Sequence, residues 1–460
     1  HYQWLFDRDV YGNDHFDWLR RQANNEAITA SQTDKKAVAH TEGGRVRWYP
    51  KGAFVLEMIK YIIGREQFNR VIKHYLEKNA YKNVDSNELL VAFQDVLGIS
   101  LNWFFDQWIY KGGEPHYKVS YYEIRNMKNE RSTEFIIEQI HDVNDYINYF
   151  KMPVKIEVYY KDGSKDTTIA NIESQVHRVV IPNKNNLDID FVLFDPNSQI
   201  LKTVSFYKYQ EELFRQALKA PYMLDRHDAV YALRNLDIEK KRETLISVYI
   251  RERFHAVKSE IIYQLALDTA RSSKDLVFNA FKDQDVNVRK AVLNYVPVTA
   301  ENENLFRKFL TDSSYLIVEG TLDKLIQKFP DRSFEYFEIT KSETGNSGRN
   351  IRVKWLELQV ALNKSNFFLS ELIGYSSNSY EFRTRINAIE ALRRINYIDE
   401  KLIKNLANAA SHFNSRLSSV ADQALQFYYK QPVYKRMLTE YYSKGILTLE
   451  EKTALKKNLK

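Results

Sequence analysis

Hydrophobic residues recur with a helical period through the first part of the chain. After Pro50, apolar residues return at i, i+4 and i+8, the spacing of one buried helix face, at Phe54, Val55, Met58, Ile59, Ile62 and Ile63. Because proline is tolerated in the first turn of a helix, Pro50 is predicted to start this helix. A second helix is predicted at the beginning of the chain, with apolar positions at Trp4, Leu5, Val10 and Tyr11.

The pattern changes to short alternating runs after Gly112-Gly113-Glu114-Pro115. Seven strand-like runs follow, at 117–124, 134–140, 154–160, 166–170, 176–181, 190–194 and 200–206. The Asp162-Gly163 pair lies between two of them and is typical of a tight hairpin turn, because these residues readily adopt positive φ. Seven short strands in about 90 residues indicate a β-sandwich.

A helical period returns after Tyr209 and continues to the end, now with an internal repeat. Four segments share a polar start followed by a face rich in alanine and valine, namely 225–233, 285–293, 381–392 and 413–425. Their aligned positions Ala229, Ala291, Ala388 and Val420 are separated by 62, 97 and 32 residues, or about two, three and one units of 31 to 32 residues. A helix-pair period of this length predicts an α-solenoid related to the HEAT type.

The fold class expected is therefore a mainly α, multidomain protein with three parts. A helical part is predicted over 1–113, a β-sandwich domain over 114–208, and a HEAT-like α-helical solenoid domain over 209–460. Solenoids present a concave groove that can bind proteins or peptides, so the last part is compatible with an enzyme wall, a binding scaffold or a purely structural role.

Composition is that of a soluble globular chain. Its 460 residues are 44% hydrophobic and 28% charged, and no apolar run approaches the roughly 18 residues of a membrane span. A net charge of +7 is mild for this length, with basic and acidic residues interleaved, so nucleic acid is not an expected partner. The absence of cysteine excludes disulfides and thiolate metal ligands, and it is compatible with cytoplasm or periplasm alike.

Tyr49 is the candidate catalytic residue, because it directly precedes the helix predicted from Pro50. A phenol at a helix start could donate a hydrogen bond to an oxyanion, which free backbone N–H groups there would also favour. The alternative is a packing role, since the chain has 31 tyrosines. Arg45 and Arg47, beside Gly43-Gly44, could meet a substrate carboxylate or a neighbouring carboxylate. Lys51 and Glu57 lie off the apolar stripe and are expected to be solvated.

Three segments in order carry a resemblance to a known family: Y-P-K-G-A-F-V-L-E-M-I from Tyr49, the stretch from Gly64 to Tyr75, and the stretch from Phe104 to Pro115. Together they resemble the zinc aminopeptidases of the aminopeptidase N family, the gluzincins. The resemblance implies that 1–113 is the C-terminal helical part of a thermolysin-like catalytic domain. It also implies zinc-dependent removal of N-terminal residues from peptide substrates, with Tyr49 steadying the tetrahedral intermediate.

The zinc motif of that family, H-E-x-x-H, does not occur in this sequence. None of the ten histidines is followed by glutamate, and no two are spaced i, i+4, the spacing that places two ligands on one helix face. The expectation is a C-terminal portion of a longer enzyme whose zinc ligands lie upstream, inactive when isolated. The alternative is a metal-free, non-catalytic relative that binds peptides or proteins through its solenoid. Compartment, oligomeric state and substrate side-chain preference are not predicted.

Overall fold

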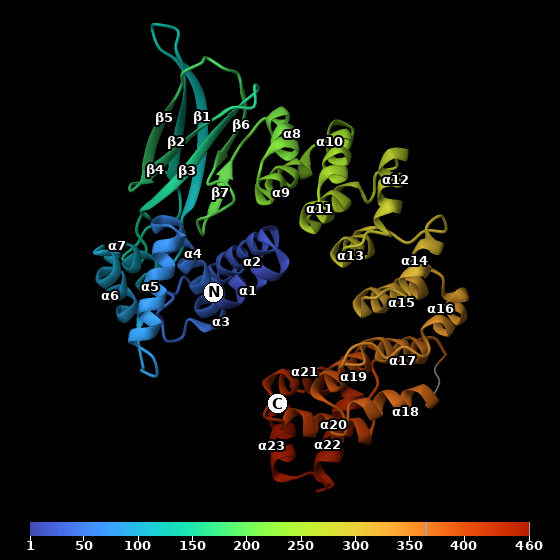
Figure 1. The fold of residues 1–460 in the computed structure, drawn as a ribbon. Coiled ribbons are helices and arrows are strands. Elements are labelled where there is room, and N and C mark those ends of the chain that lie inside the picture. Colours follow the sequence, from blue (N-terminus) through green and yellow to red (C-terminus); the bar gives the residue numbers. More distant parts are fainter. Residues whose placement is uncertain (364–365, 460) are drawn as a thin grey trace. The chain divides into compact units, whose positions relative to one another are not determined.

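The chain forms two compact units, His1–Asp268 and Thr269–Lys460. The structure is a computed structural model and describes residues 1–363 and 366–459 (Figure 1). The first unit contains the amino-terminal helices, all seven strands and four α-helices that follow them; the second unit is helical. The architecture is thus mainly helical with one small β domain, as expected. The boundaries predicted near 113 and 208 stay predictions, since the contacts group both sides of each with the first unit.

Helices fill the first 110 residues, in agreement with the hydrophobic period. Their bounds are α1 (Tyr2–Tyr11), α2 (Asn13–Ser31), α3 (Gly44–Val46), η1 (Arg47–Lys51), α4 (Gly52–Ile63), α5 (Arg65–Lys78), α6 (Ser86–Leu97), α7 (Asn102–Phe105) and η2 (Asp106–Tyr110). The apolar face of α4 is buried as predicted, with Phe54, Val55 and Met58 fully enclosed. A capping box starts α6, where Asp85 and Glu88 satisfy each other's backbone N–H groups.

The β domain has the seven predicted strands. They are β1 (His116–Arg125), β2 (Arg131–Gln139), β3 (Met152–Tyr160), β4 (Lys165–Ile172), β5 (Val176–Asn183), β6 (Ile189–Phe194) and β7 (Thr203–Phe206). Four form a sheet in the order β5-β2-β1-β7, and three form a sheet in the order β4-β3-β6 (Figure 1). Alternate side chains of both sheets enter one hydrophobic cluster that also contains the α4 face. The last strand starts at Thr203 instead of Ile200 and pairs in parallel with β1.

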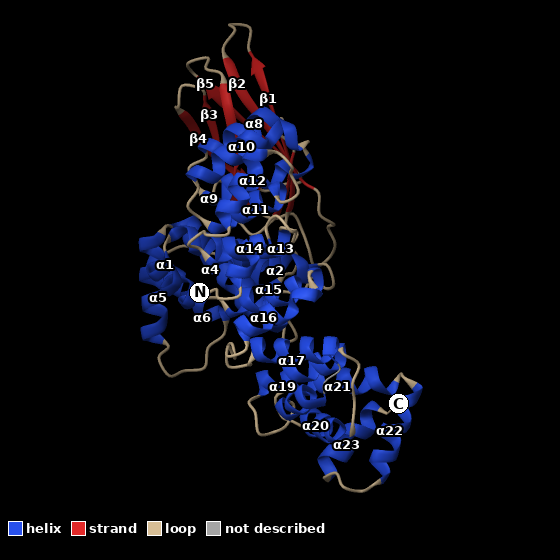
Figure 2. Ribbon diagram, turned by 90° about the vertical axis from the view of Figure 1, so that its right-hand side faces the viewer, coloured by secondary structure: helices blue, strands red, loops and turns tan. Residues whose placement is uncertain are grey.

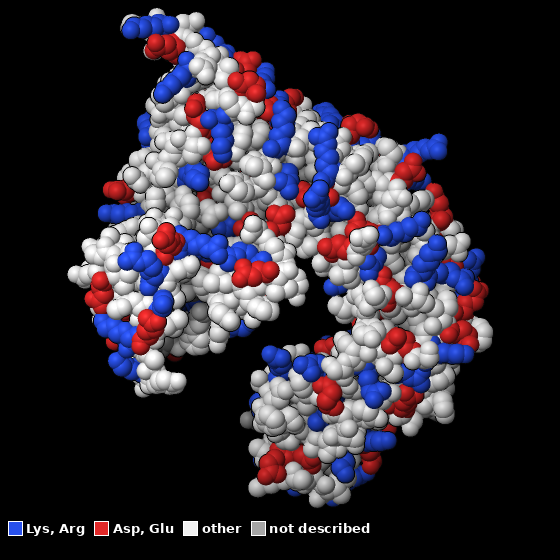
Figure 3. Space-filling model, viewed as in Figure 1, with Lys and Arg blue, Asp and Glu red and all other residues white. Residues whose placement is uncertain are grey.

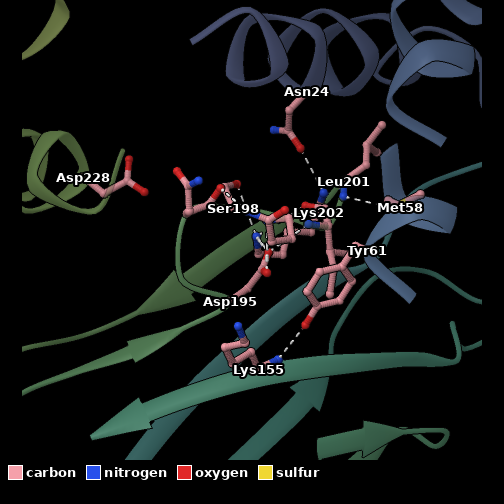
Figure 4. A network of polar contacts seen from close by, with 12 residues as sticks. Asn24, Met58, Tyr61, Lys155, Asp195, Ser198, Leu201, Lys202 and Asp228 are labelled. Atoms are coloured by element: carbon pink, nitrogen blue, oxygen red, sulfur yellow. Dashed lines mark hydrogen bonds and ion pairs between the residues drawn. The ribbon is translucent and has the colours of Figure 1, made fainter. Parts of the chain in front are cut away.

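A polar network attaches the end of the β domain to the amino-terminal helices (Figure 4). Asn24 of α2 accepts the backbone N–H of Lys202 at 2.9 Å, and Tyr61 of α4 accepts that of Lys155 at 3.2 Å. The Lys202 ammonium is buried against Asp195. The backbone of residues 200–202 therefore contacts α2 and α4 and is not the first part of a strand.

Helices α8 (Gln210–Lys219), α9 (Met223–Ala232), η3 (Leu233–Asn235), α10 (Ile238–Arg251) and α11 (His255–Leu265) complete the first unit. The first of them contacts β6, and Glu212 accepts both the Val192 backbone N–H and the Tyr121 hydroxyl. These helices are consequently fastened to the β domain by hydrogen bonds as well as by apolar packing.

The second unit is a succession of short helices (Figure 2). Their bounds are α12 (Arg271–Ala280), α13 (Val286–Tyr295), α14 (Glu303–Phe309), α15 (Tyr315–Lys328), η4 (Pro330–Arg332), α16 (Ser333–Thr340), α17 (Asn350–Asn363), α18 (Asn366–Tyr375), α19 (Phe382–Arg394), α20 (Glu400–Ala410), α21 (Ser415–Tyr429), α22 (Pro432–Ser443) and α23 (Leu449–Asn458). Three of the four polar starts of the sequence repeat are helix caps: the side chains of Asp285, Glu381 and Asn414 accept the first backbone N–H groups of α13, α19 and α21. The fourth, Asp225, lies inside α9. Helices α13, α15, α17, α19 and α21 pack each on the next.

Candidate functional site

The segment around Tyr49 is a wide turn inside a longer helix. The backbone is helical from Gly44 through α3, η1 and α4, and η1 (Arg47–Lys51) has π-helical geometry. Pro50 has no N–H to donate, and the Gly52 N–H bonds to the Arg47 carbonyl five residues back. The prediction that Pro50 starts the helix is therefore wrong. The backbone N–H of Gly52 is already bonded within the helix, so no free helix start lies at Tyr49.

Tyr49 is exposed while the residues two positions before and after it are buried. Its relative exposure is 71%, compared with 2% for Arg47 and 0% for Lys51. In a wide helical turn, positions two apart lie on opposite sides, so anchoring both neighbours inward directs Tyr49 outward. No residue in the described part of the chain forms a hydrogen bond with the Tyr49 hydroxyl, and the side chain is exposed to solvent.

Arg47 is bound to the segment that follows α2. Its Nη2 donates to the Asp34 carboxylate at 2.7 Å and to the Asp34 carbonyl at 2.6 Å, and its Nε donates to the Lys36 carbonyl at 3.4 Å. Of the two contacts expected for this arginine, the structure shows the neighbouring carboxylate. Substrate binding by Arg47 has no geometric support here, because its guanidinium is enclosed.

Lys51 is buried in an ion pair, contrary to the expectation that it is solvated. Its Nζ donates to Glu114 Oε1 at 2.8 Å and to the Gly113 carbonyl at 3.1 Å. Both side chains are almost fully enclosed, with exposures of 0% and 4%. Glu114 is a functional candidate that the sequence interpretation missed; the only signal was a carboxylate in the Gly-Gly-Glu-Pro boundary segment.

Glu57 is likewise buried instead of solvated. Its carboxylate pairs with the Lys60 ammonium and lies 2.5 Å from His1 Nε2. The hydrophobic pattern placed Lys51 and Glu57 off the apolar stripe correctly. Lys51 is paired with Glu114 from a distant segment, whereas Glu57 pairs with Lys60 three residues along the same helix and with His1 at the start of the chain.

Gly112 allows two segments of this site to approach closely. A Cβ atom there would lie 1.6 Å from the backbone carbonyl oxygen of Lys35. The Ala39 N–H also bonds to the Ile109 carbonyl at 3.0 Å, so the chain after α2 lies against the end of η2 and the residues that follow it. This contact places Asp34 and Glu114, the two carboxylate partners, on the same side of the Tyr49 turn.

A pocket of about 800 Å³ opens beside Tyr49 within the first unit. Its walls are mainly apolar and include Trp4, Leu19, Trp48, Leu56 and Ile109. Arg45 and Glu26 also line it, at 3.4 Å from each other and largely exposed. Tyr49 and Arg45 thus share one concave surface, whereas Arg47 does not contribute to it.

A smaller cavity of about 320 Å³ lies between α2, the β domain and α9, and its charged groups are engaged by charged or polar neighbours. Arg21 bonds Asp228, Lys202 bonds Asp195, and Lys208 donates to the Val192 carbonyl and to Gln216. Burial and the negative charge of Asp228 raise the pKa of Asp225, the Asn197 N–H and the Lys208 ammonium lower it, and the net result is a pKa of about 7. The cavity is a polar junction between elements.

The described residues contain no group of three or more histidine, cysteine, aspartate or glutamate side chains that could hold a metal ion. The residues around Tyr49 do not fit a zinc site, because the nearby carboxylates of Glu114 and Asp34 are engaged by Lys51 and Arg47. Across residues 1–363 and 366–459, no helix is long and apolar enough to cross a membrane. On the face drawn in Figure 3, basic and acidic side chains are interspersed.

The segment that carries Tyr49 is similar to a known protein family. Residues 19–108 match the peptidase family M1 domain, and this segment includes Tyr49, Lys51 and most of the pocket wall. This segment of the chain is therefore similar to the M1 peptidase domain.

Individual relatives are similar over limited parts of their length. "Tricorn protease-interacting factor F2" of Thermoplasma volcanium is 24% identical over 53% of this chain and 31% of the relative. "Leucyl aminopeptidase" of Saccharolobus solfataricus is 30% identical over 26% of this chain and 15% of the relative. The chain therefore spans about a third or less of the length of these curated relatives.

A solved structure shows the same fold. Aminopeptidase A of Legionella pneumophila, crystallised with aspartic acid, matches with a TM-score of 0.54 at 12% identity, over 99% of this chain and 61% of that chain. At this identity the match concerns the fold alone.

Proposed function

We propose that this chain is the C-terminal portion of a zinc-dependent aminopeptidase that hydrolyses N-terminal residues from peptides. In this proposal the phenol of Tyr49 donates a hydrogen bond to the oxyanion that forms when the first peptide carbonyl is attacked. The observation that carries it is the placement of Tyr49: an exposed hydroxyl at a pocket of about 800 Å³, on a turn held by buried residues on both sides. The M1 match over 19–108 supports it, since the match includes this turn.

The proposal assigns a limited share of the chemistry to these 460 residues. The described residues offer no zinc donor set, so neither the metal ligands nor the base that activates water is assigned to any of them. Arg45, with an exposed guanidinium at the pocket, is the arginine that we propose for contact with a substrate carboxylate. Helices α8 to α23 are proposed to form a HEAT-like solenoid, supported by the stacking of alternate helices in the second unit.

The test uses the intact protein that contains this chain. Zinc content is measured by mass spectrometry, and hydrolysis is measured on a panel of aminoacyl-anilides with their N-acetylated forms as controls. We expect one zinc per polypeptide, cleavage that a chelator abolishes and zinc restores, and no cleavage of the acetylated controls, because an aminopeptidase needs the free amine. Absence of both zinc and cleavage would overturn the proposal in favour of a metal-free relative that binds peptides or proteins through the solenoid.

A further inference from the structure

One polar network links the two buried residues that flank Tyr49. Lys51 Nζ donates to Glu114 Oε1 at 2.8 Å, and the Ser31 hydroxyl donates to the same oxygen at 3.0 Å. Ser31 Oγ in turn accepts from Arg47 Nη2 at 3.4 Å. Arg47 and Lys51 are the first and last residues of η1, so the ends of this turn are tied to one another through Ser31 and Glu114.

The partners of this network come from two further segments. Asp34 and Ser31 belong to the end of α2 and the chain after it, and Glu114 with the Gly113 carbonyl belongs to the start of the β domain. The Gly112 contact with Lys35 brings these two segments together. The Tyr49 turn is thus held at both ends by two segments that also contact each other.

Such a network is a costly way to gain stability alone. Taking an ammonium and a carboxylate out of water opposes most of their mutual attraction, and apolar replacements of a buried ion pair are often neutral or stabilising. Buried ionic groups do fix geometry, because their hydrogen bonds are directional and an unpaired member is strongly disfavoured. The enclosed Lys51–Glu114 pair, at 0% and 4% exposure, is therefore better explained by what it positions.

The network positions Tyr49, whose hydroxyl is not held by a hydrogen bond of its own to any described residue. Within the described residues, the Tyr49 hydroxyl has no hydrogen-bond partner, so the backbone of η1 sets where the phenol can reach. A hydrogen bond to a developing oxyanion depends steeply on placement, and an error of about 1 Å can cost on the order of 100-fold in rate.

We propose that Glu114 is a positioning residue for Tyr49, acting through Lys51 and Ser31. This inference rests on the proposed function, because it assigns a device that orients the proposed oxyanion donor. Glu114 and Lys51 do not touch substrate; they hold the turn so that the phenol meets the transition state without rearrangement.

The decisive variant removes the ion pair without leaving a lone buried charge. In the intact protein, Lys51→Met/Glu114→Leu is expected to lower kcat at least 10-fold while KM changes less than threefold and the thermal midpoint stays within a few degrees. Added to Tyr49→Phe, the pair should cause no more than a threefold further loss, because a displaced phenol and an absent one are equivalent.

The control is the Arg234–Glu260 pair, a bidentate ion pair at 2.6 Å that joins η3 to α11, away from Tyr49, with side-chain exposures of 34% and 7%. Arg234→Met/Glu260→Leu should leave kcat within twofold of the parent. If it lowers kcat as much as the Lys51/Glu114 variant, the effect is general and the positioning role is overturned.

The remaining outcomes separate the two proposals. If Tyr49→Phe lowers kcat and the Lys51/Glu114 variant does not, the positioning role fails and the proposed function stands. If Tyr49→Phe has no effect, the oxyanion role fails and the positioning role fails with it. Should the double variant not fold, Glu114→Asp keeps both charges and shortens the reach; a three- to tenfold loss of kcat at constant KM supports the role, and unchanged kcat overturns it.

Discussion

Arg21 of α2 holds both carboxylate oxygens of Asp228 on α9, at 2.5 and 2.8 Å. Partial burial would raise the pKa of Asp228, but the attraction of Arg21 and hydrogen bonds from His227 and Arg21 outweigh it, and the pKa lies well below its ordinary value. This bidentate pair joins the amino-terminal helices to the first helices after the β domain, within one unit.

Asp228→Asn should lower the free energy of unfolding of the first unit by about 1 kcal/mol at pH 6. The magnitude is modest because the carboxylate keeps 44% of its side-chain exposure and solvent screens the pair. Because the pKa of Asp228 is lower in the folded state, the ion pair stabilises the fold at pH values above about 4, the unfolded-state pKa. This stabilisation is lost as the pH falls below about 4. Urea unfolding followed by tryptophan fluorescence measures this, since five of the six tryptophans lie in the first unit. A difference that persists unchanged at pH 3 would contradict it.

Asp225 should show the opposite pH dependence. Its pKa is raised to about 7 by burial and by Asp228, so the folded unit holds a proton that the unfolded chain has released. Stability is then present below pH 4 and lost as pH rises to about 7, by at most about 4 kcal/mol for three pKa units.

Asp225→Asn should remove this loss while keeping an acceptor for the Asn197 N–H, which lies 3.1 Å from the carboxylate. In urea titrations, we expect the variant to have a higher free energy of unfolding than the parent at pH 8 and the same free energy of unfolding at pH 4.5. The charges of Lys208 and Asp195 act on the same carboxylate, so both residues are kept unchanged in this comparison. Equal differences at both pH values would refute the assignment.

Gly112→Ala should destabilise the first unit by about 1 to 3 kcal/mol, because the added methyl group meets the Lys35 carbonyl, a backbone atom that cannot rotate away. Gly374→Ala is the matched control: no atom lies within 4 Å of its added Cβ, and alanine favours the helix α18. That control should be neutral or stabilise by about 0.5 kcal/mol. Thermal unfolding of both variants decides, and equal stability of Gly112→Ala and the parent would disprove the close approach.

Tyr49→Phe in the intact protein should lower kcat on the order of 100- to 1000-fold with little change in KM, since it removes one oxyanion donor and leaves the ring. Steady-state hydrolysis of an aminoacyl-anilide measures both constants. The exposed side chain contributes little to folding, so the thermal midpoint should not move. Tyr110→Phe provides a control at another exposed tyrosine. A loss of less than about threefold would remove Tyr49 from the catalytic assignment.

Periodicity predicted the elements well because burial of one face is a local property. The α4 face and all seven strands follow directly from where apolar residues fall. The start of the helix at Gly44 was not predicted. A π-helical turn that contains a proline has the same sequence pattern as a helix that begins at Pro50. Residues 200–202 are extended and apolar enough to suggest a strand, yet their backbone bonds to Asn24 and Met58 instead of a neighbouring strand.

The candidate site was predictable only in part. Tyr49 could be chosen from its motif, and it lies at a pocket with Arg45. The burial of Arg47, Lys51 and Glu57 could not be predicted, because it depends on contacts with Asp34, Glu114 and His1, which lie in other segments of the chain. A charged residue reads as solvated in any local pattern, and only tertiary pairing reverses that.

The parallel pairing of β7 with β1 has a consequence for synthesis. His116 to Val119 align with Thr203 to Phe206, so the first strand of the β domain completes its sheet only with the last. During translation one edge of β1 therefore stays unpaired until the whole domain has left the ribosome. Such long-range closure slows folding and leaves a strand edge open to wrong partners, so nascent chains stalled before Phe206 should be the species most dependent on chaperones.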